Sequence, residues 1–244
     1  MLRAHPPRDR AGRGGLALSR VEGSPVTESP APYPTVGTRL APLSAVAVAV
    51  LSQVLMRDRI AVGGRFVVPM IELVLAITLI AVDGVVPAER RRAGIVRYAL
   101  AITLCVSATS SAALMIADVL EVKPVSVQQM FAEGSQILVV LAVGFGLLFW
   151  QLDRGGPNGR ILPEPELMSF WFTQDAIREY SDQFDSWQPR FLDYLYVGIT
   201  NLVAFSPTDT MPLTRTAKAL MTWESFVSIA TFAVVLSRAV NVMK

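Results

Sequence analysis

The chain has 244 residues, of which 52% are hydrophobic and 17% charged, and its formal net charge is +2. Soluble domains carry roughly 25% charged residues, so this composition indicates a membrane protein, and the small, scattered charge excludes a nucleic-acid-binding surface. His5 is the only histidine and Cys105 the only cysteine, which excludes Ser-His and Cys-His catalysis, an intrachain disulfide and histidine or cysteine metal sites. We therefore expect no enzyme activity, no catalytic residues, no metal and no cofactor.

Residues 1–38 are rich in Arg, Pro, Gly and Ser and contain almost no clustered apolar side chains. Such a segment buries too little apolar surface to offset its ordering entropy, so we expect a disordered tail. No apolar core follows Met1 closely and no small-residue cleavage site is evident, so a signal peptide is not expected.

Residues 39–152 contain four apolar blocks, which predict a four-helix transmembrane region. The first block is about 16 residues long, which is marginal against the roughly 20 needed to cross a bilayer. The fourth ends in an aromatic pair and then a Gly-Pro break, as membrane helices do at the interface. The blocks are Ala41–Met56, Phe66–Val82, Tyr98–Leu120 and Ile137–Leu152.

Residues 153–189 form a polar loop with more Asp and Glu than Arg. Phe172, Ala176, Tyr180 and Phe184 follow one another at four-residue spacing, with charged residues between them. This pattern predicts a short amphipathic helix that rests on the membrane surface or on neighbouring helices. An ordinary solvated loop is the alternative.

Residues 190–244 contain a short apolar segment followed by a final span, Thr216–Val242. The apolar part of the short segment runs for about 14 residues before Ser206-Pro207 interrupts it. At 1.5 Å per residue it covers roughly 21 Å, less than the roughly 30 Å hydrocarbon core. A half-helix at membrane depth is tolerated only where protein or water surrounds it, which is typical of pore loops.

Several residues of this C-terminal segment match the pattern of a pore module. Asp193–Tyr196 stands at the start of the half-helix, Asp209–Thr214 follows it, and Glu224, Ser228 and Arg238 lie in the last span. Residues 190–241, about a fifth of the chain, thus resemble the pore module of two-helix potassium channels. The chain is also similar to a family of uncharacterised bacterial multi-pass membrane proteins with four preceding helices and the same degenerate pore-like end.

The resemblance places residues 204–208 on the potassium filter sequence T-V-G-Y-G. A potassium filter needs rings of backbone carbonyls, which two glycines permit, whereas this segment has no glycine and Pro207 fixes its φ near about −65°. The resemblance therefore implies a degenerate or non-potassium-selective pore for monovalent ions, formed by a homo-oligomer, a tetramer by analogy. The filter-like residues are Ala204, Phe205, Ser206, Pro207, Thr208 and Asp209.

Four further residues are expected to support this module. An acid such as Glu72 inside a membrane span marks either a proton or ion site or a hydrogen-bonded packing contact with a neighbouring helix. The channel resemblance implies that Glu224 supports the filter from behind and that Ser228 stands at the hinge position of the inner helix. Asp193 is expected to cap the N-terminus of the half-helix.

The fold class expected is all-α: a polytopic transmembrane bundle of about five spans plus a re-entrant half-helix, or six spans if residues 190–206 cross outright. We favour the re-entrant arrangement because the half-helix is short. Arginine clusters near Arg90 and in the tail favour six spans under the positive-inside rule. The function expected is a channel-like protein in the lipid bilayer of the cell membrane; the alternative is a non-conducting scaffold or partner-binding subunit.

Overall fold

The computed structural model describes residues 36–56, 60–61, 63–64, 66–82, 87–121, 125–160, 167–177, 187–203 and 210–242. All of them belong to one compact unit, Tyr33–Lys244. The expected tail lies outside the described residues except for residues 36–38, which begin the first helix. The filter-like residues Ala204–Asp209 also lie outside them.

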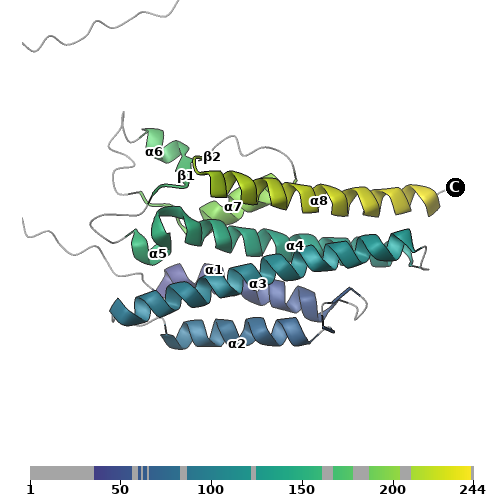
Figure 1. Cartoon of the computed structure of the whole chain (residues 1–244), viewed down its shortest axis with the longest axis horizontal. Helices are drawn as coiled ribbons and strands as arrows, with labels where there is room; N and C mark the ends of the chain where they lie inside the picture. Colours follow the sequence, from purple (N-terminus) through teal and green to yellow (C-terminus); the bar gives the residue numbers. More distant parts are fainter. Residues whose placement is uncertain are drawn as a thin grey trace, which may run out of the picture. The chain divides into compact units, whose positions relative to one another are not determined.

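Five helices form the body of this unit, and each runs antiparallel to the next in the chain (Figure 1). Three segments are long and apolar enough to cross a membrane, namely Arg92–Leu120, Val127–Gly155 and Arg215–Val240, and Leu40–Val54 and Val67–Ile80 are shorter apolar helices. The predicted, mostly helical fold with membrane-spanning segments is confirmed to this extent. The five helices are α1 (Val36–Val54), α2 (Val67–Val82), α3 (Pro87–Leu120), α4 (Val127–Leu152) and α8 (Arg215–Val242).

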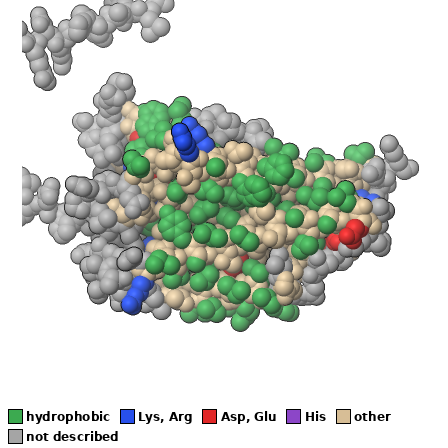
Figure 2. All heavy atoms as spheres, viewed as in Figure 1, with side chains coloured by type: hydrophobic (Ala, Val, Ile, Leu, Met, Phe, Trp, Pro, Cys, Tyr) green, Lys and Arg blue, Asp and Glu red, His purple; other side chains and the backbone are tan. Residues whose placement is uncertain are grey.

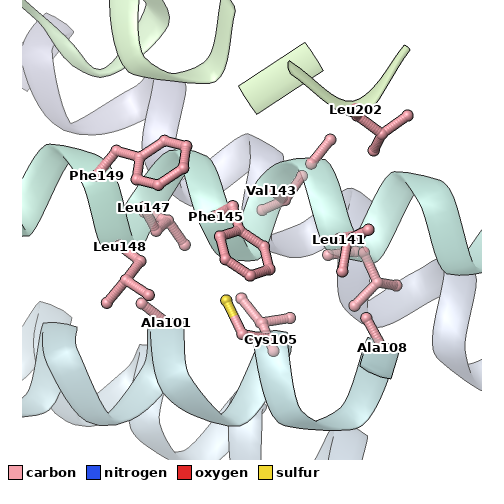
Figure 3. Packing of buried hydrophobic residues seen from close by; sticks show 14 of the residues in the cluster. Ala101, Cys105, Ala108, Leu141, Val143, Phe145, Leu147, Leu148, Phe149 and Leu202 are labelled. Atoms are coloured by element: carbon pink, nitrogen blue, oxygen red, sulfur yellow. The ribbon is translucent and has the colours of Figure 1, made fainter. Parts of the chain in front are cut away.

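Helix α4 is the central helix, and it packs against α1, α3, α8 and the short helix α7 (Phe191–Leu202). It begins at a capping box, in which Ser126 Oγ accepts from the Gln129 N–H and Gln129 Oε1 accepts from the Ser126 N–H. Phe145 and its neighbours face Cys105 of α3 across a fully apolar contact (Figure 3). Cys105 is therefore a small core residue of the bundle.

The outward faces of the helices are covered with large apolar side chains. On α2 most residues other than Glu72 are exposed or half-buried, including Met70, Val74 and Ile77. Figure 2 shows hydrophobic side chains over much of the visible face, with charged atoms mainly toward its two ends. Apolar exposure on this scale is typical of a surface that contacts lipid or another protein rather than water.

The chain after α4 turns sharply, through residues in the left-handed region. Arg154 has φ 53°, and Gly155 and Gly156 both have φ 71°. Two short helical turns, η1 (Asp153–Gly155) and α5 (Gly156–Gly159), follow directly. The break that the sequence predicts after Trp150 is thus present, with α4 ending at Leu152.

A two-stranded antiparallel ribbon, which the sequence did not predict, connects the loop to the start of α8. Strand β1 (Phe170–Phe172) pairs with β2 (Thr210–Pro212), with Trp171 opposite Met211. The amphipathic helix predicted from Phe172 is wrong at that residue, which lies in β1, because backbone pairing with β2 replaces local helix formation. Only α6 (Thr173–Ile177) is helical, and Tyr180 and Phe184 lie outside the described residues.

The ribbon fixes the relative position of two distant helix ends. The Leu213 N–H donates to Ser169 O over 2.8 Å, and the Ser169 N–H donates to Asp153 Oδ1 over 2.6 Å. The C-terminus of α4 and the N-terminus of α8 therefore lie at the same end of the bundle, which we name the ribbon end. Tyr98 of α3 also reaches it, donating to Gln151 O over 2.9 Å.

Substitution of Gly146 tests the close contact between α4 and α7. A Cβ added to Gly146 would lie 3.0 Å from Leu195 Cα, a backbone atom that cannot move without shifting α7. We expect Gly146→Ala to lower the free energy of unfolding in detergent by about 1–3 kcal/mol. The control is Gly94→Ala in α3, where the nearest atom is Gln151 Nε2 at 3.8 Å; equal losses in the two variants would contradict the proposed contact.

Candidate functional site

The polar groups of the C-terminal half form two clusters, one at each end of α7. The first surrounds Asp153, which is fully buried directly after α4. Its Oδ1 accepts hydrogen bonds from the Ser169 N–H at 2.6 Å and the Phe170 N–H at 3.1 Å. Its Oδ2 accepts one from the Tyr194 hydroxyl at 2.5 Å. One carboxylate thus connects the end of α4, strand β1 and the first turn of α7.

Two arginines supply the positive charge of this first cluster. Arg154 Nε lies 3.4 Å from Asp153 Oδ2, and Arg160 is held by hydrogen bonds. Its Nη2 donates to Tyr194 Oη at 2.9 Å and to Trp150 O at 2.8 Å, and its Nη1 donates to Pro189 O at 3.2 Å. The guanidinium also lies 5.0 Å from the centroid of the Tyr194 ring. Burial lowers the pKa of Arg160 from its usual value, while interactions with Tyr194 and Asp153 oppose that shift.

A second ion pair extends the cluster into the loop. Arg154 Nη2 lies 2.7 Å from Asp175 Oδ2, and both side chains are largely shielded from solvent. Asp175 also accepts a hydrogen bond from the Phe172 N–H at 3.2 Å. Phe172 in turn packs edge-on against Tyr194, with ring centroids 5.3 Å apart. The described part of the acidic loop is therefore bound to the bundle.

Helix α7 starts beside this cluster and has 12 residues. Asp193 Oδ2 accepts a hydrogen bond from the Arg190 N–H at 2.6 Å, so the side chain expected to cap the half-helix lies at its N-terminus. The helix packs closely on α4: a Cβ added to Gly198 would lie 3.3 Å from Ala142 O. Leu192, Tyr196, Ile199 and Val203 form its exposed face.

The second polar cluster lies at the other end of α7, against the middle of α8. Asn201 Nδ2 donates to Glu224 Oε2 at 2.7 Å and to Met221 O at 2.8 Å. Ser225 Oγ donates to Asn201 Oδ1 at 3.1 Å, and Ser228 Oγ donates to Leu202 O. Glu224 follows Arg215 by nine residues, so this cluster lies about 14 Å along α8 from the ribbon end.

Glu224 and Ser228 thus both contact the C-terminal end of α7, and both are fully buried. Glu224 Oε1 has no hydrogen-bond partner among the described residues. The structure brings Glu224 and Ser228 together with Asn201, and places Asp193 at the opposite end of α7. It leaves Glu72 in a separate part of the bundle, where Gln53 Nε2 donates to Glu72 Oε2 at 2.5 Å.

Sequence reasoning missed the residues that complete these clusters. Asn201 carried a usable signal, because an amide inside an apolar half-helix needs a partner. Asp153 and Arg160 carried none, and Tyr194 was noted only as part of the start of the half-helix, because nothing in the local sequence relates residues separated by up to 41 positions. Gln53 of α1 provides the hydrogen bond that one of the two interpretations of Glu72 required, but the sequence did not identify Gln53 as the partner.

Comparison of the chain with protein-family models, with curated proteins and with solved structures finds no match.

The Asp153–Tyr194 hydrogen bond is tested with a double-mutant cycle. Tyr194→Phe removes the hydroxyl that donates to Asp153 and accepts from Arg160, and leaves two buried charged groups short of a partner. We expect it to lower the free energy of unfolding by about 1–3 kcal/mol, measured by denaturation in detergent.

In the cycle, Asp153→Asn is combined with Tyr194→Phe. The two changes should couple by about 0.5–3 kcal/mol, since each removes the other's partner. Strictly additive losses would show that the two groups do not interact.

Proposed function

We propose that this chain is a membrane protein of ion-channel-like architecture. In this proposal α1, α2, α3, α4 and α8 cross the bilayer, and α7 enters it from the ribbon end as a half-helix. The chain is back at the ribbon end by Thr210 of β2, and identical subunits enclose a shared opening.

One observation carries the proposal: strand β1, which precedes α7 in the chain, and strand β2, which follows it, both lie at the ribbon end. The α4 terminus binds β1 through Asp153, and β1 pairs with β2 immediately before α8. Helix α7 starts beside Asp153 and ends against Glu224, about 14 Å along α8. Because α7 reaches only partway along α8 while the residues before and after it are held at one end, this arrangement supports the proposal of a pore loop.

The polar groups at the end of α7 fit this interpretation. A helix that stops at membrane depth leaves backbone carbonyls without partners, and these must be satisfied within protein. Ser228 and Ser225 of α8 donate to the carbonyls of Leu202 and Asn201. Glu224 holds the Asn201 side chain. These contacts support the bracing role expected for Glu224. Ser228, which the resemblance places at the hinge position of the inner helix, also contacts the end of the half-helix.

The exposed face of α7 supports an oligomer. Leu192, Tyr196, Ile199 and Val203 lie on one side of a half-helix that ends at membrane depth. Because a broken helix is tolerated there only beside protein or water, this face requires cover from another subunit or borders a water-filled space. A single copy of the module cannot enclose a pore, and the channel resemblance implies four copies.

A non-conducting scaffold is the second candidate, and the distribution of arginine favours it. The start of α1, the end of α2, the start of α3 and the start of α8 share the ribbon end. The Arg90-Arg91-Arg92 cluster and the Arg-rich tail adjoin that end in sequence, so the positive-inside rule assigns it to the cytoplasm. The resemblance to potassium channels instead implies that the half-helix enters from outside.

Single-cysteine labelling in intact cells and inverted vesicles decides between these arrangements. Because Cys105 is the only cysteine, a Cys105→Ala background allows Leu167→Cys, Met211→Cys and Leu120→Cys to be introduced singly at exposed positions. The proposal expects positions 167 and 211 on one side and position 120 on the other. Labelling of 167 and 211 on opposite sides would mean that α7 crosses outright.

The same variants report which side the ribbon end faces. An external ribbon end supports the channel, and a cytoplasmic one rejects it in favour of the scaffold. The labelled variants also keep the ribbon intact, because Leu167 lies before β1 and the Met211 side chain is exposed.

Cation flux into liposomes tests conduction with a matched pair of variants. Purified protein should pass monovalent cations down a gradient. Glu224→Gln should retain most of the flux, because its amide oxygen still accepts from Asn201, whereas Glu224→Leu should lose it severalfold. Absence of flux for the unmodified chain under every gradient rejects the channel, and equal flux in both variants rejects the role of Glu224.

A further inference from the structure

Glu72 lies outside the module just described, in the part of the bundle formed by α1, α2 and α3. It is the only charged residue of α2, and α1 carries none between residues 41 and 56. Its side chain is fully buried. An isolated carboxylate in this position is costly unless a donor or a cation compensates its charge.

The protein compensates only part of the carboxyl group. Gln53 Nε2 donates to Oε2 at 2.5 Å. Ser107 of α3 is also near the carboxyl group, but its hydroxyl donates to Leu104 O at 3.0 Å. Oε1 has no hydrogen-bond partner among the described residues. No Lys or Arg of the described residues forms an ion pair with Glu72 in the structure.

A small cavity of about 10 Å³ is lined by Gln53, the partner of this group, although Glu72 itself is not among the lining residues. Its polar lining is Gln53, Ser107 and Ser111, two of which also approach the Glu72 carboxyl. Val68 and Pro69 line it from α2, and Glu72 follows them by four and three residues, on the same helix face. Because side chains on a helix lean toward its N-terminus, the Glu72 side chain leans toward this cavity.

The cavity has the size and donors for one small guest. A space of about 10–15 Å³ holds one water-sized particle. Gln53, Ser107 and Ser111 offer neutral oxygens, which are the ligands that hard cations prefer. One carboxylate charge balances one positive charge. Ala61 and Gly64, which are half-buried residues of the α1–α2 connection, line the cavity at the end opposite the ribbon.

We propose that Glu72, Gln53, Ser107 and Ser111 bind one dehydrated monovalent cation, reached from the end of the bundle opposite the ribbon. The cation competes with a proton for the Glu72 carboxylate. On α3, Cys105 faces α4 and Asp118 lies about two turns beyond Ser111. The remaining titratable groups of α3, which are Glu89 to Arg92, Arg97 and Tyr98, lie toward its N-terminus, and α1 carries only Arg39. The site is independent of α7, so its failure and that of the channel proposal are separate results.

The test uses a hydrophobic carbodiimide, which modifies buried carboxyl groups when they are protonated. The full-length protein in detergent is treated in sodium chloride, potassium chloride or choline chloride at equal ionic strength, and modified residues are located by mass spectrometry. Sodium or potassium should slow modification of Glu72 severalfold relative to choline. Glu224 is the internal control, since it is equally buried with one unpartnered oxygen, but its partner Asn201, unlike Gln53, does not line this cavity.

Two variants complete the test. Ser111→Ala should raise the cation concentration needed for protection about tenfold and leave the rate in choline unchanged. Glu72→Gln should abolish the increase in unfolding temperature that sodium or potassium gives the unmodified protein, because ligand binding to the folded state is lost. Protection by neither cation, equal protection of Glu224, or an unchanged thermal response in Glu72→Gln overturns the proposal.

Discussion

The buried carboxylate of Asp153 is the interaction on which the arrangement of the C-terminal half depends. A charged group without water must find its hydrogen bonds within the protein. Asp153 finds them in three places: two backbone N–H groups at β1 and the hydroxyl of Tyr194 in α7. These contacts bring a loop and a helix, which follow α4 in the chain, back against its end. The β1–β2 pairing then positions the start of α8.

The route of α7 follows from this constraint together with the small residues of α4. With its N-terminus held at the ribbon end, α7 runs along α4 because Gly146 permits the close approach of Leu195. Its C-terminus lies against Glu224, Ser225 and Ser228 of α8. Glu224 accepts a hydrogen bond from the Asn201 side chain, and the two serines donate to the last carbonyls of a helix that ends inside the bundle. Each end of α7 thus has a polar cluster, and the side chains along the helix between the two clusters are mostly apolar.

Glu72 and Glu224 illustrate how equal burial leads to different proposed roles. Glu224 accepts a hydrogen bond from the side chain of Asn201. It lies close to Gly198, where the backbones of α7 and α4 approach each other closely. Glu72 accepts a hydrogen bond from Gln53, which with Ser107 and Ser111 forms the polar lining of a small cavity. The first environment supports a neighbouring helix, whereas the second has room for a guest. Residue type and burial alone do not separate these cases; the space beside each carboxyl group does.

Hydropathy, which depends on composition over a window of neighbouring residues, was sufficient to locate the five apolar helices and the break after Trp150. It did not give their starts, because α3 begins at Pro87 and α4 at Val127, well before the apolar blocks that begin at Tyr98 and Ile137. The sequence also indicated that Phe191–Val203 is short for a membrane span and that Glu72 and Glu224 need partners. Only the tertiary structure decided that β1 pairs with β2, that Phe172 is in a strand and that Asp153, Arg160 and Tyr194 meet. These contacts join residues tens of positions apart, and their hydrogen bonds leave no periodic pattern in the sequence around them.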